Sequence, residues 1–390
     1  MEKRVCKSRF FQNALVTVPR YPAARVNGEN VYDEKIMSMP AMISSTTTDQ
    51  SSIAATSSTT ELGAYLFFIF NFENYYHFLY DTLPYLVFYF RLREVEPDCK
   101  LLIPENHRFL QFQSEVFELL GIRQEDWVCA KDGAVYQTLY VPSSLTHGKF
   151  ADGESASRAP PDDAAHEIWQ RLAKAAKAAT GPVIYAPKIY ISRRTWVNGD
   201  TSNIGTNYTT RRRCENEDEV VKVLRQHGFA EVFCENFSMA EKIKMFAGAK
   251  AVVGFIGGGM ANCLFAGPDC RVGCMETPEF LTINSRFAFS MDHCQTDYLN
   301  CCSLAVHEGP FPLYVRVKTP DGVGEIESFH PDTQKYTVKL AGGVVAGFAL
   351  GGEFESREYN ADLLEPLDRG LNSPFVCDLE KLREWLVSNF

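Results

Sequence analysis

The sequence predicts an α/β fold, and three observations indicate it. Apolar runs such as Ala251–Val253 have the length and composition of buried parallel strands, and segments with helical periodicity separate them. Helix starts are marked between the runs; Ser238 with Glu241, for example, forms a capping-box pattern. After Cys302 the pattern changes to alternating apolar and polar residues, which predicts a small antiparallel, barrel-like β module after the α/β part.

Length, composition and charge narrow the class of protein. A chain of 390 residues has room for two medium domains, and 45% hydrophobic with 23% charged residues is typical of a soluble globular protein. The formal net charge of −10 argues against a nucleic-acid partner, because no basic face can dominate. We find neither an apolar signal core nor a membrane span, so the sequence predicts a cytoplasmic location; the secretory pathway is the alternative if an N-terminal anchor is missing.

Composition and pattern divide the chain into five segments. In order, we expect an N-terminal extension with a Ser/Thr-rich loop, a first α/β lobe with a linker, a second, Rossmann-like lobe, a small β module, and a tail with a helix. The bounds of these segments are residues 1–63, 64–163, 164–305, 306–352 and 353–390. The loop is Ser44–Thr60, the linker is Gly148–Asp163, and the terminal amphipathic helix is Asp378–Phe390.

Strands and helices alternate in the first lobe. The apolar run Ala64–Phe70 predicts a buried strand, and the next segment, Asn71–Leu92, predicts a very apolar helix. The pattern then predicts a strand at Lys100–Pro104, a helix at His107–Leu120, and strands at Trp127–Ala130 and Ala134–Val141.

The second lobe is more regular. It opens with an alanine-rich helix, Ala164–Ala179, and Asn216 can cap a later helix that Gly228 stops. We expect strands at Val183–Ser192, Phe229–Cys234, Ala251–Val253 and Arg271–Glu276. This alternation predicts a parallel, doubly wound sheet that binds its ligand at the carboxyl ends of the strands.

Three consecutive glycines, Gly257–Gly259, fall at that edge of the sheet. Glycine lets the backbone approach a ligand closely, and the free N–H groups of a following helix suit an anion such as a nucleotide diphosphate. A plain tight turn between strand and helix is the alternative. Glu276, at the end of the next strand, could accept hydrogen bonds from ribose hydroxyls, or it could be an exposed strand-end carboxylate.

A second candidate site lies on the apolar helix of the first lobe. Glu73, His77 and Asp81 recur every four residues, so they share one face of that helix. Burying an imidazole or a carboxylate without partners is costly, so His77 and Asp81 either satisfy each other in the core or line a cleft. In a cleft, either group could take a proton from an acceptor hydroxyl.

Arginines near strand ends and helix starts supply positive charge. Arg193 and Arg194 follow Ser192, and Arg211–Arg213 precede the helix start at Asn216. Guanidinium groups there could neutralise a diphosphate, although such runs are also common on solvated faces. We find no D-x-D pair, no phosphate loop and no G-x-G-x-x-G fingerprint, so we expect no cofactor and no protein-bound metal at the diphosphate.

The cysteines give no clear signal. The 12 cysteines include no C-x-x-C pair and one adjacent pair, Cys301-Cys302. This pattern indicates neither a zinc site nor a disulfide framework, and it predicts reduced, mostly buried thiols.

Several of these segments, in this order, resemble the family 61 glycosyltransferases, which include plant arabinoxylan transferases and O-linked N-acetylglucosamine transferases of the secretory pathway. NYYHFLYDTLPYL resembles the family's N-Y-Y-H-W/F-L-x-D-x-L-P segment, IYISRR its strand ending in Ser-Arg, and RRRCENEDEV its R-x-x-N-E helix start. SMAEKIKMFAGAKAVVG resembles its helix–strand unit, and GGGMANCLF the end of its G-x-H-G-A-G-L-x-N turn. The resemblance covers Ala64–Pro278.

This resemblance implies a GT-B-like fold, in which two Rossmann-like lobes face a cleft, the second binds most of the nucleotide sugar, and the anomeric carbon is inverted. It makes His77 and Asp81 the catalytic candidates. The implied donor-binding residues are Ser192, Arg193, Arg213, Asn216, Glu217, Gly257, Gly258, Gly259, Asn262 and Glu276. The chain departs from the family at Ile256, where the turn histidine is expected, and at Gly258, where alanine is expected.

We therefore expect an inverting, metal-independent glycosyltransferase that moves a hexosyl or pentosyl group from a nucleotide sugar, such as a UDP-sugar, to a hydroxyl of a glycan or glycoprotein. The alternative is a non-catalytic carbohydrate- or nucleotide-sugar-binding protein, which the departure at Ile256 favours. A Rossmann-type methyltransferase or oxidoreductase would need an early glycine loop, whereas the first predicted strand leads into Asn71-Phe72-Glu73.

Overall fold

The computed structural model describes most of the chain, and the described residues are 8–32, 37, 59–147, 160–181, 186–194, 212–277, 280–283, 285–305, 308–340, 344–345, 348–349, 355–370 and 372–390. Several sequence predictions fall wholly or partly outside them. Among these are most of the Ser/Thr-rich loop, residues 148–159 of the linker, the start of the strand predicted from Val183, Arg211, and parts of the β module expected at 306–352.

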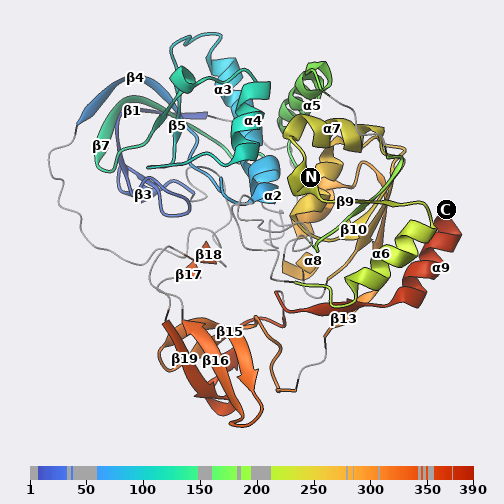
Figure 1. Cartoon of the computed structure of the whole chain (residues 1–390). Helices are drawn as coiled ribbons and strands as arrows, with labels where there is room; N and C mark the ends of the chain where they lie inside the picture. The colour runs from blue at the N-terminus through green and yellow to red at the C-terminus, as the bar shows by residue number, and fades with distance from the viewer. Residues whose placement is uncertain are drawn as a thin grey trace.

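The first α/β unit is built on a seven-stranded mixed sheet of order β3-β2-β1-β7-β4-β5-β6 (Figure 1). Strands β7, β4, β5 and β6 are parallel, and β1 pairs antiparallel with β7, so the chain's first strands join this sheet. The strands are β1 Ser8–Thr17, β2 Arg25–Val26, β3 Glu29–Asn30, β4 Thr60–Phe67, β5 Lys100–Ile103, β6 Trp127–Cys129 and β7 Ala134–Pro142; helix α4 is Gln111–Leu119.

The predicted apolar helix of this unit is not continuous. It begins at Tyr75 rather than Asn71, and it runs as α2 Tyr75–His77, the π-helical η1 Phe78–Thr82, the 3-10 helix η2 Leu83–Tyr85 and α3 Leu86–Leu92. Pro84 lacks the N–H that a regular α-helix needs, so the hydrogen-bond spacing changes around it. Glu73 lies before the helix and is exposed, so the prediction that it shares a face with His77 and Asp81 is wrong.

The second unit is built on five parallel strands of order β12-β11-β10-β8-β9. Numbered along the chain, this order is 2-1-3-4-5, so the predicted parallel, doubly wound sheet is confirmed. Strand β12 was not predicted. The elements are β8 Lys188–Ile191, β9 Ala230–Val232, β10 Ala251–Phe255, β11 Arg271–Met275, β12 Gln295–Leu299, α5 Asp163–Ala178, α6 Glu217–Gln226, α7 Met239–Gly248, α8 Phe280–Ile283 and α9 Leu379–Asn389.

Helices α5 and α7 lie between the two sheets, whereas α6 and α9 cover the far face of the second sheet (Figure 1). Two hydrogen bonds illustrate the contact between the units. Trp169 Nε1 donates to the carbonyl of Leu79 at 2.8 Å, and the N–H of Met239 donates to Glu115 Oε2 at 2.7 Å. The described helices include none with the length and apolar character needed to cross a membrane.

The C-terminal β module is an antiparallel sheet of order β19-β16-β15-β14-β20 with its own small core around Ile326 and Tyr336. It extends to Pro366, beyond the expected boundary at residue 352. The chain leaves the second unit through β13 Cys302–Leu304 and returns through β21 Phe375–Cys377, which pairs with β13 (Figure 1). The module strands are β14 Arg316–Thr319, β15 Gly322–His330, β16 Lys335–Leu340, β19 Glu355–Asn360 and β20 Glu365–Pro366.

Candidate active site

The centre of the second sheet, where the chain reverses its winding direction, lies between β8 and β10. These neighbouring strands are parallel, so their carboxyl ends meet at one edge. Ser192 and Arg193 follow β8, and the glycine turn Gly257–Gly259 follows β10. In doubly wound sheets this reversal point is where the crevice for a ligand forms, so the sheet order brings two of the predicted donor-site segments together.

The glycines of the turn are needed for close packing. A Cβ atom at Gly257 would lie 2.5 Å from Arg193 Nη1, and one at Gly259 would lie 2.7 Å from Ile191 Cγ2. The guanidinium of Arg193 therefore lies directly against the turn. Residues Gly258–Phe265 then form a 3-10 helix, η8, with the N–H of Met260 donating to the carbonyl of Gly257 at 2.9 Å.

Ile256, at the family's histidine position, is fully buried. Its N–H donates to the carbonyl of Met275 on β11 at 2.9 Å, and its side chain belongs to the hydrophobic core. An apolar side chain therefore packs in the core of the second unit at the position where the family pattern has a histidine.

Glu217 holds the Ser192–Arg193 segment through hydrogen bonds. Its Oε1 accepts hydrogen bonds from the N–H of Arg193 at 2.6 Å, from Tyr190 Oη at 2.7 Å and from Ser192 Oγ at 3.1 Å. The residue is buried, and this burial raises the pKa of Glu217 despite the three donors. Glu217 therefore positions Arg193 by holding the backbone at the end of β8.

Asn216 does not cap helix α6, although the sequence predicts that it does. Its side chain instead brackets Cys377: Nδ2 donates to the carbonyl of Cys377, and Oδ1 accepts from its N–H, both at 2.8 Å. The side-chain amide of Asn216 therefore bonds to strand β21 instead of to the first turn of α6. Arg213 is exposed, and Glu276 is half-buried at the end of β11, where burial raises its pKa.

The first unit contacts the glycine turn through Tyr75. Its hydroxyl donates to Asn262 Oδ1 at 2.6 Å, and Asn262 Nδ2 donates to the carbonyl of Gly259 at 2.8 Å. Asn262 is fully buried, and the ammonium of Lys242 lies 4.7 Å from the centre of the Tyr75 ring. Tyr75 opens helix α2, which also carries His77, so this contact links the segment with His77 to the glycine turn.

Asp81 is buried in a dense set of polar contacts. His77 Nδ1 lies 2.6 Å from Oδ2, whereas Thr146 Oγ1 at 2.7 Å and Arg286 Nη1 at 2.6 Å both donate to Oδ1. Burial alone would raise the pKa of Asp81, but the charges of Arg286 and His147 and the bond to His77 hold it well below its usual range. The carboxylate is therefore ionised and fully engaged.

Arg286 comes from the second unit, on the 3-10 helix η9 Ser285–Ser290. Its guanidinium also donates to the carbonyl of Thr146 at 3.4 Å, and His147 Nε2 lies 3.9 Å from Asp81 Oδ1. Both Arg286 and His147 are buried. The polar cluster around Asp81 is thus shared by the two units.

Four residues of this region were not identified from the sequence. Thr146 and His147 lie in the loop after β7, a strand parallel to β4, and polar residues after a parallel strand could have been taken as a signal. Tyr75 lies in a run of aromatic residues, and nothing in the sequence distinguishes it from its neighbours. Arg286 lies 205 positions from Asp81, and nothing around it indicates a site.

This arrangement has two chemical capabilities. An imidazole oriented by a buried carboxylate can accept a proton from a hydroxyl, and His77 and Asp81 form a pair of this kind. A guanidinium lying against a glycine turn can hold an anion together with backbone N–H groups.

Comparison with known proteins identifies the family. The sequence model of the family described as Glycosyltransferase 61 matches residues 75–273, which is slightly more than half of the chain. The matched span includes His77, Asp81, Arg193 and the glycine turn, whereas Glu276 and Arg286 lie outside it. A search of curated proteins found no match. The resemblance seen in the sequence is thereby confirmed, and the chain belongs to glycosyltransferase family 61 and is a glycosyltransferase.

Proposed function

We propose that this protein is an inverting, metal-independent glycosyltransferase of GT-B architecture that transfers a sugar from a UDP-sugar to a hydroxyl of a glycan or glycoprotein. One relationship carries the proposal. Arg193 and the glycine turn lie together at the reversal point of the second sheet, and the Tyr75–Asn262 hydrogen bond places that turn beside the segment with His77 and Asp81. Glycosyl transfer needs a site for the nucleotide-sugar donor next to a group that accepts the proton of the acceptor hydroxyl, and these two segments would supply them.

On the donor side, Arg193 and the N–H groups around Gly258 hold the diphosphate. Burial lowers the pKa of the Arg193 guanidinium, but an arginine starts from so high a pKa that it stays charged. A fixed positive charge beside the turn stabilises the negative charge that develops on the leaving diphosphate. Glu276, at the end of the adjacent strand β11, accepts hydrogen bonds from the ribose hydroxyls in this proposal.

On the acceptor side, His77 is the general base and Asp81 orients it. The His77 side chain is 22% exposed, against 9% for Asp81, and the Asp81 carboxylate already interacts with His77, Thr146 and Arg286. A carboxylate with a strongly lowered pKa is a poor proton acceptor. The bond at Nδ1 selects the tautomer in which Nε2 carries the lone pair, so Nε2 accepts the proton.

The reaction is then a single displacement. The acceptor oxygen forms a bond to the anomeric carbon while the bond from that carbon to the diphosphate oxygen breaks on the opposite face. The acceptor proton passes to His77, and the electron pair of the broken bond leaves with the diphosphate. Holding both partners in line removes much of the entropic barrier and inverts the anomeric configuration.

A donor screen tests the proposal. The purified chain is incubated with a panel of UDP-sugars and hydroxyl acceptors, and the product anomer is assigned by NMR. We expect UDP release, a product of the opposite anomeric configuration, and equal turnover with and without added Mg²⁺ or Mn²⁺. A product that retains configuration, or turnover that requires the added metal, would contradict the proposed mechanism.

A further inference from the structure

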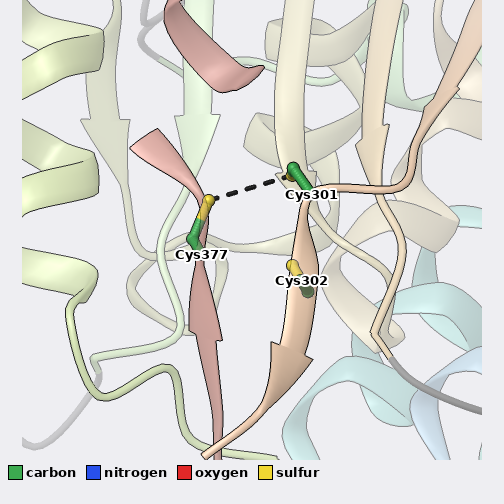
Figure 2. Close-up of side chains that lie close together, drawn as sticks. All are labelled: Cys301, Cys302 and Cys377. Atoms are coloured by element: carbon green, nitrogen blue, oxygen red, sulfur yellow. Dashed lines mark hydrogen bonds between the residues drawn. The ribbon is translucent and has the colours of Figure 1, made fainter. Parts of the chain in front are cut away.

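Three cysteines from two distant segments gather where β13 pairs with β21. Cys302 begins β13, Cys301 directly precedes it, and Cys377 ends β21 (Figure 2). The three Sγ atoms all lie within 4.8 Å of one another, and those of Cys301 and Cys377 are 3.8 Å apart. Within the described part of the chain, no other group of three or more His, Cys, Asp or Glu side chains is close enough to hold a metal ion.

The backbone explains how the side chains of Cys301 and Cys302, which are adjacent in the chain, can both face Cys377. Cys302 pairs with Cys377 across the two strands, as the register requires. Cys301 lies in a sharp turn just before β13, in which its N–H donates to the carbonyl of Leu299 at 2.9 Å. This turn breaks the alternation of side chains that a regular strand would impose, so the thiols of Cys301 and Cys302 both approach Cys377.

The cluster is held in place by contacts that do not involve sulfur. Asn216 brackets the backbone of Cys377 with two hydrogen bonds of 2.8 Å, and the N–H of Asp378 donates to the carbonyl of Cys301 at 2.7 Å. Cys301 and Cys377 are buried, whereas Cys302 is half-buried. The site is therefore preorganised, and Cys302 leaves it a route to solvent.

We propose that Cys301, Cys302 and Cys377 form a binding site for a zinc ion that pins the returning β21–α9 segment to the second unit. Thiolates around tetrahedral zinc, each about 2.3 Å from the metal, are separated by about 3.8 Å, which is the separation of Cys301 and Cys377. A water molecule or an external thiol fills the fourth position. The absence of a C-x-x-C pair hid the site in the sequence, because the fold brings its ligands together across strands.

The metal–thiolate group would be anionic, and one lysine beside it offsets that charge. Each thiol releases its proton when zinc binds, so three thiolates and one Zn²⁺ carry a net charge of −1. Helix α9 begins two residues after Cys377, and the carboxylate of its N-cap residue, Asp378, accepts hydrogen bonds from the N–H groups of Glu380 and Lys381. Lys381, on the first turn of that helix, donates to the carbonyl of Asn300 at 3.5 Å, which places a full positive charge beside the cluster.

Metal binding is tested on the full-length, reduced, metal-free chain with Zn²⁺ and Co²⁺ as probes. We expect one equivalent of Co²⁺ to give a thiolate charge-transfer band that Zn²⁺ abolishes, and Zn²⁺ to raise Tm. Zn²⁺ should also protect the half-buried Cys302 from alkylation, while the half-buried Cys129 and Cys294 still react. This mapping needs no variant, so it holds even if a substitution prevents folding.

Two variants and a matched control complete the test. Cys301→Ser and Cys377→Ser should lose the Co²⁺ band and the rise in Tm, whereas Cys294→Ser, outside the cluster, should keep both. Absence of binding to the folded natural chain, protection of other cysteines, or a Cys301–Cys377 disulfide in the chain as isolated would overturn the proposal. None of these measurements uses transferase activity, so the outcome is independent of the proposed function.

Discussion

Arg286 Nη1 lies 2.6 Å from Asp81 Oδ1, and this buried ion pair joins the two α/β units. The bond belongs to the same cluster that orients His77, so the closure of the units and the alignment of the imidazole depend on one carboxylate.

Replacing Arg286 by methionine should destabilise the protein by about 3–5 kcal/mol, because it leaves the charge of Asp81 buried without its main partner. Urea unfolding measures the change. Arg91→Met is a matched control, since Arg91 pairs with Glu167 between the same two units but both side chains are about half exposed. The control should lose less than about 1 kcal/mol. Equal losses in the two variants would argue against a special role for the buried pair.

The contribution of Asp81 to stability should depend on pH in a defined window. In the folded protein, the charge of Arg286 holds the pKa of Asp81 well below its usual value, so the unfolded chain binds the proton more readily as the pH falls. The stabilisation is therefore complete above about pH 4 and is lost as the pH falls through the lowered folded pKa. The free energies of unfolding of the natural chain and of Asp81→Asn, measured from pH 8 downward, should not begin to converge until about pH 4. A difference that already shrinks between pH 7 and pH 5 would contradict this.

His77→Ala should lower kcat by about 10²–10⁴-fold, the usual contribution of a general base, while donor affinity is unchanged. Steady-state kinetics and calorimetric titration with the donor separate the two effects. His166→Ala, which removes an exposed histidine from α5, serves as the control and should retain its activity. Retained turnover in His77→Ala would move the base to another group.

Gly257→Ala should weaken donor binding by about tenfold or more. The added Cβ would lie 2.5 Å from Arg193 Nη1, a flexible side-chain end that can move aside, so the protein still folds but the guanidinium is displaced. Loss of one charge-assisted hydrogen bond costs about 1.5–3 kcal/mol. Gly267→Ala, where a Cβ meets nothing within 4 Å, should bind the donor normally. Similar affinities for the two variants would place the diphosphate elsewhere.

Tyr75→Phe should cost about 1–3 kcal/mol of stability, because the buried Asn262 Oδ1 loses its donor. Tyr65→Phe removes a partly exposed hydroxyl that donates to the carbonyl of Leu62, and water can replace that bond. Thermal unfolding of the two variants compares them. A larger loss for Tyr65→Phe would mean that the Tyr75–Asn262 bond contributes little to the contact between the units.

The sequence predicted the second sheet well because its signals are local. The apolar run of β10, the glycine turn and the capping box at Ser238 each depend on a few adjacent residues, and the structure has all three. The capping box is formed as expected, with Ser238 Oγ accepting from the N–H of Glu241 at 3.3 Å.

Features that depend on distant contacts were missed. Asn216 is of a residue type that is favoured at helix N-caps, but its side-chain amide makes two hydrogen bonds to the backbone of Cys377 instead. The pairing of His77 with Asp81 followed from their spacing, whereas the presence of Arg286 did not, because tertiary packing alone brings it there. The proposed zinc ligands likewise meet only because β13 pairs with β21.

The pairing of β13 with β21 also bears on how this lineage can diversify. Leu304, near the exit of the chain from the second unit, lies opposite Phe375, near its return. The segment between Leu304 and Phe375 leaves and rejoins the second unit at neighbouring positions. It can therefore be lengthened, replaced or deleted in evolution without interrupting the five-stranded parallel sheet. Other members could therefore carry unrelated appendages at this position while the transferase body stays intact.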